Sequence, residues 1–291
     1  MNHNRFDEVV FFNGGKMLFE KIDLSAFSKL KQMPVYHTLR FSDFGRDDSS
    51  GQSEVLFDKD NRQIISDSKN CKECEVFHQH LVYCFYGRPV YKWEGAEPFP
   101  IFFVFSSESI EEPAAIYPFD SGAFFHGRYE DAYSSNNVTD YCLGDAKKGY
   151  KTEDVPRMIS MIWETNLNYY EAEAPREYGE LFKELIWLTK FDKEYIKMVL
   201  EWKGKRKYYK NTDSRAITIE YIYKNVLKLE SLLAVYVPNG TGEQDIADLQ
   251  IVFGEGINVE CLPGRSGDVQ DAFDQMVKHE RQRLLKEGSH L

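Results

Sequence analysis

The sequence predicts a mixed α+β protein, and three observations lead to this prediction. Short runs rich in β-branched and aromatic residues occur early and late in the chain. Between Glu153 and Lys203 the hydrophobic period becomes helical, and Asp268 to Lys286 has the pattern of a charged amphipathic helix. Strands separated by a helical segment usually complete one sheet system. We therefore expect a single domain over residues 1–291, with a helical insertion at residues 153–210.

The expected strands share a high content of β-branched and aromatic residues. They are Glu8–Phe12, Val35–Leu39, Leu81–Tyr86, Pro100–Phe105, Ala216–Ile222, Leu232–Val237, Leu249–Phe253 and Ile257–Leu262. In the helical region, Leu181, Leu185 and Leu188 recur at helical spacing, and we expect Asp192 to cap a second helix. The polar residues 46–72 are expected to form a long surface loop.

Composition limits the classes of function. The net charge of −11 argues against an electrostatic grip of the whole protein on nucleic acid and leaves only a local basic segment for that task. No apolar run reaches the roughly 18 residues of a membrane span, so no membrane association is expected. The polar start Met1–Asp7 lacks the pattern of a signal peptide, and the five cysteines are an odd number. We expect a cytoplasmic protein with mostly reduced thiols.

The segment Leu81–Tyr91 combines a strand with an arginine at its end. The strand stops at Gly87-Arg88-Pro89, because glycine permits an unusual turn and proline cannot continue the ladder. A guanidinium between Tyr86 and Tyr91 suits a phosphate clamp beside a stacking surface. The alternative is a surface arginine that follows an ordinary strand.

Two further strand-like segments carry polar residues that could bind a ligand or take part in catalysis. His37 and Thr38 interrupt the run Pro34–Arg40, where a lone histidine is more often a satisfied core residue than a ligand-binding one. In the run Ala216–Ile222, strand alternation places Glu220 on the face of Thr218, where a catalytic acid could sit. From spacing alone, an exposed strand glutamate is the favoured alternative.

Taken in order, these three segments resemble the ADP-ribosyltransferase family, in particular its DarT-like branch of toxins that modify nucleic acid. The resemblance starts at Tyr36-His37-Thr38-Leu39 and continues through Phe85-Tyr86-Gly87-Arg88-Pro89-Val90-Tyr91. It ends at Ile217-Thr218-Ile219-Glu220, before an apolar strand that closes in Val237-Pro238. The fold that the resemblance implies is an α+β arrangement of split, twisted mixed β-sheets with a helical insertion.

The resemblance also implies a reaction and roles. The chain would consume NAD and transfer ADP-ribose to a nucleic acid or another macromolecule, as a toxin or antiviral-defence effector with an antitoxin or regulatory protein as a partner. The catalytic residues would be Glu220 and Arg88. The NAD-binding residues would be His37, Thr38, Tyr86 and Tyr91. NAD glycohydrolysis and a non-catalytic binding protein on the same scaffold are the alternatives.

Other residues compete for the catalytic role or extend the site. Two other carboxylates are substitutes for Glu220 as the catalytic group. They are Asp120, which with Ser121 and Gly122 is expected to form a turn, and Glu130. The run Lys203–Lys210 mixes basic residues with tyrosines, as single-strand binders do, although most such runs are solvated helix ends. Its expected nucleic-acid contacts are Lys205, Arg206, Lys207 and Tyr208.

The chain also contains zinc-compatible side chains close together. They are Cys71, Cys74, His78 and His80. Their spacing is too short for an ordinary zinc finger, and no distal pair of ligands is evident. Reduced loop cysteines with partly exposed histidines are the alternative, and we expect no metal.

Overall fold

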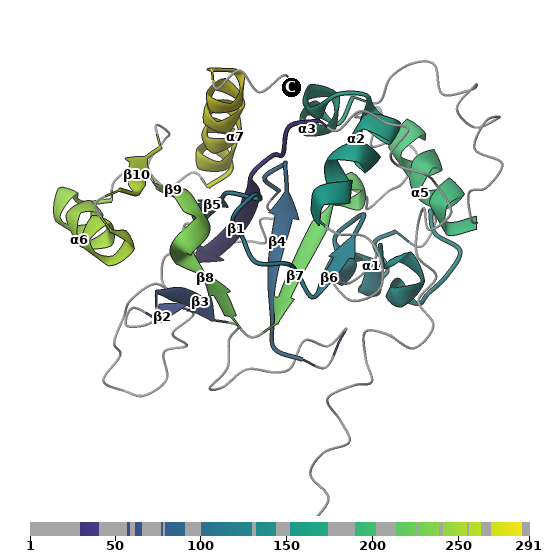
Figure 1. The fold of residues 1–291 in the computed structure, drawn as a ribbon, viewed down its shortest axis with the longest axis horizontal. Helices are drawn as coiled ribbons and strands as arrows, with labels where there is room; N and C mark the ends of the chain where they lie inside the picture. Colours follow the sequence, from purple (N-terminus) through teal and green to yellow (C-terminus); the bar gives the residue numbers. More distant parts are fainter. Residues whose placement is uncertain are drawn as a thin grey trace, which may run out of the picture. The chain divides into compact units, whose positions relative to one another are not determined.

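The computed structural model describes the chain in segments (Figure 1). They are residues 30–40, 57–58, 62–65, 77, 79–90, 100–129, 132–143, 152–173, 190–201, 214–224, 226–238, 241–254, 256–262 and 269–286. The chain divides into two compact units. Unit 1 is made of Met1–Lys31, Glu73–Gln79 and Glu112–Ile222, and unit 2 of Gln32–Lys72, His80–Glu111 and Tyr223–Leu291. Helices and strands occur in both units, which confirms the mixed α+β class, whereas the single domain over residues 1–291 stays a prediction.

In unit 2, five strands lie side by side in the order β10-β9-β5-β1-β4. Their bounds are Val35–Arg40 for β1, Leu81–Tyr86 for β4, Pro100–Phe105 for β5, Leu232–Val237 for β9 and Asn258–Cys261 for β10. The neighbours run antiparallel, except that β10 is parallel to β9. A small sheet joins β2 (Phe57–Asp58), β3 (Gln63–Ile65) and β8 (Val226–Lys228), and the unit also holds η6 (Leu229–Ser231), α6 (Glu243–Phe253) and α7 (Val269–Lys286).

One face of this sheet forms a core with α7, the yellow helix of Figure 1. The strand registers pair Tyr36 with Val104 and Phe102 with Tyr236, so these side chains emerge on the same face. They belong to one cluster with Ala234, Leu262 and Met276, against which Phe273 and Val277 also pack. Positions 273, 276 and 277 have the spacing of one helix face, which explains why the charged C-terminal sequence still folds onto the sheet.

In its described residues, unit 1 contains one strand pair and most of the helices. Strand β6 (Ala115–Tyr117) runs antiparallel to β7 (Glu220–Lys224), whose residues up to Ile222 belong to this unit. The helical elements are α1 (Ser121–Phe125), η3 (Val138–Tyr141), η4 (Thr152–Asp154), α2 (Val155–Trp163), α3 (Asn166–Glu171), α5 (Lys190–Glu201) and η5 (Ser214–Ile217). Three of these, α2, α3 and α5, lie in the expected helical insertion. None of the described helices has the length and apolarity that crossing a bilayer requires.

Most of the expected elements are confirmed. The strands Leu81–Tyr86, Pro100–Phe105 and Leu232–Val237 agree to the residue, and those expected at Val35–Leu39 and Ile257–Leu262 agree within one residue at each end. The helix expected at residues 268–286 is α7. The strand expected at Glu8–Phe12 and the helix around Leu181 lie outside the described residues, as do residues 46–56 of the loop expected at 46–72. The remainder of that expectation is wrong, because strands β2 and β3 lie within it. Strand β3 pairs with β8 and buries Ile64, so this polar stretch is held by a distant strand.

Three further expectations are wrong. Leu249–Phe253 is the end of helix α6, in which Leu249 and Phe253 are buried while Ile251 is 79% exposed. Residues 214–217 form the 3₁₀ turn η5, so the run Ala216–Ile222 becomes a strand only at Glu220. Asp192 lies inside the first turn of α5 and does not precede it. For residues 249–253, the apolar run alone did not reveal the helix. Glu243 and Asp245 in the first turn of α6 favour it.

A buried carboxylate fastens α7 to the sheet of unit 2. Glu280 is fully buried, and its two oxygens accept hydrogen bonds from the hydroxyls of Tyr36 and Tyr236. The guanidinium of Arg283 donates to the same two oxygens, from Nε at 3.0 Å and from Nη2 at 2.8 Å. Each oxygen therefore has two donors, one of them charged, which is the condition for burying a carboxylate without a large penalty.

We predict that Glu280→Gln lowers the free energy of unfolding by about 3 kcal/mol or more. The amide group of glutamine would place two hydrogens where one tyrosine hydroxyl and one guanidinium N–H already donate. Urea unfolding measures the loss. The matched control is Glu260→Gln, since Glu260 is a partly exposed partner of His279 at 3.2 Å and its loss should cost less than about 1 kcal/mol. Equal losses in the two variants would contradict the assigned role of Glu280.

Candidate functional site

The candidate site in unit 1 begins where strand β6 turns into helix α1. Tyr117 ends the strand and is paired with Glu220, the first residue of β7. Asp120 then caps α1 from an extended backbone (φ −63°, ψ 106°), and its Oδ1 accepts the Ala123 N–H at 2.7 Å. The turn expected at Asp120 is therefore the start of a short helix, and this helix brings Asp120 beside the start of β7.

Arg215 holds Asp120 from the opposite side. Its Nη1 donates to Asp120 Oδ2 at 3.0 Å, and the Asp120 backbone N–H donates to the Arg215 carbonyl at 3.0 Å. Both side chains are only 12% exposed, so this ion pair is far less screened by solvent than a surface pair. Arg215 is not among the site residues predicted from the sequence, because a partner 95 residues away along the chain leaves no local signal.

Glu220 is the second carboxylate of the site. It is 1% exposed, so the alternative of an exposed strand glutamate is wrong. Its Oε2 accepts the Ser121 N–H at 3.0 Å, in the first turn of α1. Burial raises the pKa of Glu220 well above its usual range, and the negative charge of Asp120 raises it further. Ser121 and the guanidinium of Arg215 lower that pKa in part.

Tyrosine side chains fix the irregular segment that leads into Glu220. The hydroxyls of Tyr133 and Tyr195 donate to the carbonyls of Ala216 and Ile217, both at 3.3 Å. The hydroxyl of Tyr169 accepts the Ile219 N–H at 2.9 Å. These three tyrosines come from the loop after α1, from α5 and from α3. They satisfy backbone groups that a strand ladder would otherwise satisfy, so the turn η5 can hold Arg215 in place.

Residues expected to bind NAD lie in unit 2. His37 on β1 is buried, and its Nδ1 lies 2.7 Å from the carbonyl of Tyr83. Because a carbonyl only accepts, Nδ1 carries the proton, and burial lowers the pKa of His37 to about 4 although this hydrogen bond raises it. The imidazole is therefore neutral near pH 7, with Nε2 as an acceptor that has no hydrogen-bond partner among the described residues. Thr38 follows on the same strand and is half-buried.

The strand end at Arg88 has the predicted turn. Gly87 has a φ of +66°, a conformation that glycine adopts without strain, and its N–H donates to the Pro34 carbonyl at 2.7 Å. Tyr86 is fully buried, and its hydroxyl accepts the Met33 N–H at 3.0 Å. Burial also raises the pKa of Tyr86. Tyr86 thus anchors the start of β1, and Arg88 is half-buried after the turn.

Several predicted site residues lie outside the described residues. They are Tyr91, Lys205, Arg206, Lys207, Tyr208 and Glu130, together with Cys71, Cys74 and His78 of the zinc-compatible group. Within the described part of the chain, no group of three or more histidine, cysteine, aspartate or glutamate side chains could hold a metal ion. Glu220 and Asp120 are the two candidate carboxylates that the structure brings together.

Comparisons with models of protein families, with curated proteins and with solved structures find no match to this chain.

The raised pKa of Glu220 predicts a specific pH dependence of stability. Between the unfolded and folded pKa values, the folded state holds a proton that the unfolded state has released, so the free energy of unfolding falls as pH rises. For one proton the slope reaches about 1.4 kcal/mol per pH unit. Glu220→Gln keeps an acceptor for the Ser121 N–H but has no proton to release. The free energy of unfolding of this variant, relative to that of the natural protein, should therefore increase with pH.

Urea unfolding from pH 5 to pH 8 measures this difference. Glu173→Gln is the matched control, since Glu173 is an exposed glutamate of the same unit and should follow the natural protein at every pH. Parallel curves for Glu220→Gln and the natural protein would show that the carboxyl of Glu220 titrates alike in the folded and unfolded states.

Proposed function

We propose that this protein is an NAD-consuming mono-ADP-ribosyltransferase with Glu220 as its catalytic carboxylate. The observation that carries the proposal is the buried pair of Glu220 and Asp120, held by Arg215 and by the first turn of α1. Buried carboxylates whose pKa is shifted by a second charge are concentrated at functional sites. The glutamate of this pair is also the one that the resemblance to ADP-ribosyltransferases marks as catalytic.

The chemistry explains the need for such a carboxylate. The bond between the nicotinamide nitrogen and the ribose C1′ breaks, and nicotinamide leaves with the electron pair as a neutral molecule. Positive charge then develops on the ribose, and a fixed carboxylate stabilises it best where water is excluded. An acceptor nucleophile bonds to C1′ and releases its proton. Ionised Glu220 would supply the negative charge. The ion pair with Arg215 would balance the charge of Asp120 and keep Asp120 in place.

The proposed contacts with NAD come from the resemblance and from the state of His37. A neutral imidazole whose Nδ1 is committed to Tyr83 offers Nε2 as an acceptor for a ribose hydroxyl. Thr38, Tyr86 and Tyr91 are the further NAD-binding residues of the proposal. Arg88 is proposed to neutralise the pyrophosphate, for which a guanidinium is suited.

Glu220→Gln should abolish NAD cleavage, with a loss of about 10² to 10³-fold or more in turnover, because the charge that opposes the ribose cation disappears. Release of nicotinamide from NAD measures the reaction, and Glu173→Gln is the control that should retain it. In the natural protein, turnover should rise with pH, since only ionised Glu220 is active and its pKa is raised.

The same assay identifies rivals for the catalytic role. Turnover that survives Glu220→Gln and is lost in Asp120→Asn would assign the catalysis to Asp120, and a loss only on replacement of Glu130 would assign it there. Free ADP-ribose as the sole product would identify an NAD glycohydrolase. Absence of turnover in the natural protein with protein, nucleic-acid and small-molecule acceptors would leave a non-catalytic binding protein.

The proposed acceptor is a nucleic acid that binds the basic segment Lys205, Arg206, Lys207 and Tyr208. Replacing its three basic residues with glutamine should weaken transfer to single-stranded nucleic acid and reduce the log–log salt slope by about 0.7 to 0.9 for each lost phosphate contact. Cleavage of NAD without acceptor should remain unchanged. Transfer that responds neither to salt nor to these substitutions would point to a protein or small-molecule acceptor.

A further inference from the structure

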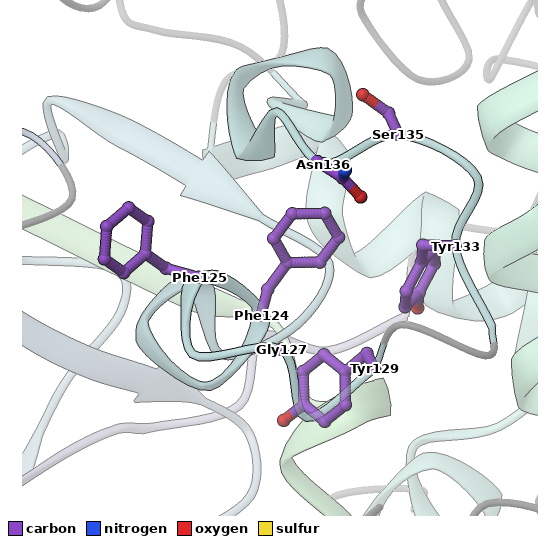
Figure 2. A pocket seen from close by; sticks show the side chains of 7 residues that line it. All are labelled: Phe124, Phe125, Gly127, Tyr129, Tyr133, Ser135 and Asn136. Carbon is purple, nitrogen blue, oxygen red and sulfur yellow. The ribbon is translucent and has the colours of Figure 1, made fainter.

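A small cavity at the C-terminal end of α1 has walls of aromatic rings. Its volume is about 70 Å³, and it is lined by Phe124, Phe125, Gly127, Tyr129, Tyr133, Ser135 and Asn136. Figure 2 shows the rings of Phe124, Tyr129 and Tyr133 around it and the side chains of Ser135 and Asn136 on one side. Phe124, Tyr129 and Tyr133 are buried, whereas Phe125 is 48% exposed at the rim.

The orientation of the rings excludes a slot for a flat ligand. The ring of Tyr133 is inclined by 56° to that of Phe124, at a centroid distance of 5.8 Å, and by 65° to that of Tyr129, at 6.3 Å. A planar ring stacks between parallel faces, and these walls instead form a corner. A corner of aromatic faces and edges fits a rounded group, which touches each wall at a different angle.

The size of the cavity limits what can enter it. A dry cavity of about 150 Å³ holds benzene, so a volume of about 70 Å³ takes in only part of a ligand. The methyl groups on one side of an alkylated nitrogen can enter it while the rest of the group stays at the rim beside Phe125. Such a head group is apolar on its outside and charged at its centre, which is the combination that a set of aromatic rings binds best.

Charge around the cavity favours a cation. Among the residues that the structure describes, no lysine or arginine lines the cavity. The carboxylate of Glu194 lies behind its wall, where it accepts the hydroxyl of Tyr141 at 2.6 Å and the N–H of Ser134, next to Tyr133, at 3.1 Å. Both tyrosines are in ring contact at 4.9 Å. Glu194 also has an ion pair with the exposed Lys190 at 3.9 Å.

The walls are fixed before any ligand binds. Phe119 stacks on Phe124 at 5.1 Å with an interplanar angle of 10°, and it contacts Tyr133 at 4.8 Å. The hydroxyl of Ser135 donates to Asp140 at 2.6 Å and accepts the Asn137 N–H at 3.1 Å, which holds the rim loop. Fixed walls spare a ligand the entropic cost of ordering them.

We propose that this aromatic cavity binds an alkylated ammonium group. The group belongs to a small quaternary amine or to a methylated lysine side chain, whose head groups share the same chemistry. The proposal is independent of the NAD reaction, and its test needs no NAD.

The test compares a cation with its neutral isostere by calorimetry on the full chain. Choline should bind at least about tenfold more tightly than 3,3-dimethyl-1-butanol, in which carbon replaces the charged nitrogen. A short peptide with one trimethyl-lysine, compared with its unmethylated form, distinguishes the two sources of the group. Preference for choline or for the methylated peptide supports the proposal and identifies the source. Equal binding of choline and the neutral alcohol, or no millimolar binding of either cation, overturns it.

Ring variants establish that the binding occurs in this cavity. Tyr129→Leu should weaken binding of the cation about tenfold, whereas Tyr129→Phe keeps the ring face and should retain it. Thermal unfolding of both variants checks that the fold persists. If Tyr129→Leu does not fold, Phe125→Leu at the exposed rim, with a smaller expected loss of binding, takes its place. Unchanged affinity in every folded variant that lacks a ring would place the binding elsewhere and overturn the proposal.

Discussion

Burial of the Glu220 carboxyl group is the constraint on which the organisation of unit 1 depends. A carboxyl group without water must be neutralised by a proton, paired with a cation or surrounded by donors. Glu220 accepts the Ser121 N–H at 3.0 Å, and among charged groups the carboxylate of Asp120 has the largest effect on its pKa, which it raises by repulsion. Arg215 forms its ion pair with Asp120 and not with Glu220. The pKa of Glu220 is therefore raised, and its carboxyl group holds a proton more tightly.

Glu280 of unit 2 shows what a purely structural solution looks like. It is as deeply buried as Glu220, but its oxygens receive two tyrosine hydroxyls and a bidentate guanidinium. Such a carboxylate is saturated with donors and has no capacity left to stabilise anything else. Among the described residues, no salt bridge reaches Glu220. The contrast between two buried glutamates of one chain is therefore the physical reason for seeking chemistry at Glu220.

Sequence reasoning succeeded where one local rule decided the outcome. The alternating strands β4, β5 and β9 agree to the residue, and the turn at Gly87 has the positive φ that the glycine suggested. It failed where tertiary contacts decided. The pairing of Arg215 with Asp120 links residues 95 positions apart, and the 3₁₀ turn η5 exists because tyrosines from distant elements satisfy its backbone. Glu220 itself could be singled out from the sequence, but its burial and its second carboxylate could not.

The two features of unit 1 share the helix α1. A helix of five residues cannot persist alone, since nucleation is costly and few hydrogen bonds repay it. At its start, Asp120 caps the chain and Glu220 accepts the Ser121 N–H. At its end, Phe124 is packed into the aromatic cluster that forms the walls of the cavity. The carboxylate pair and the aromatic cluster therefore hold the same short helix, one at its start and the other at its end.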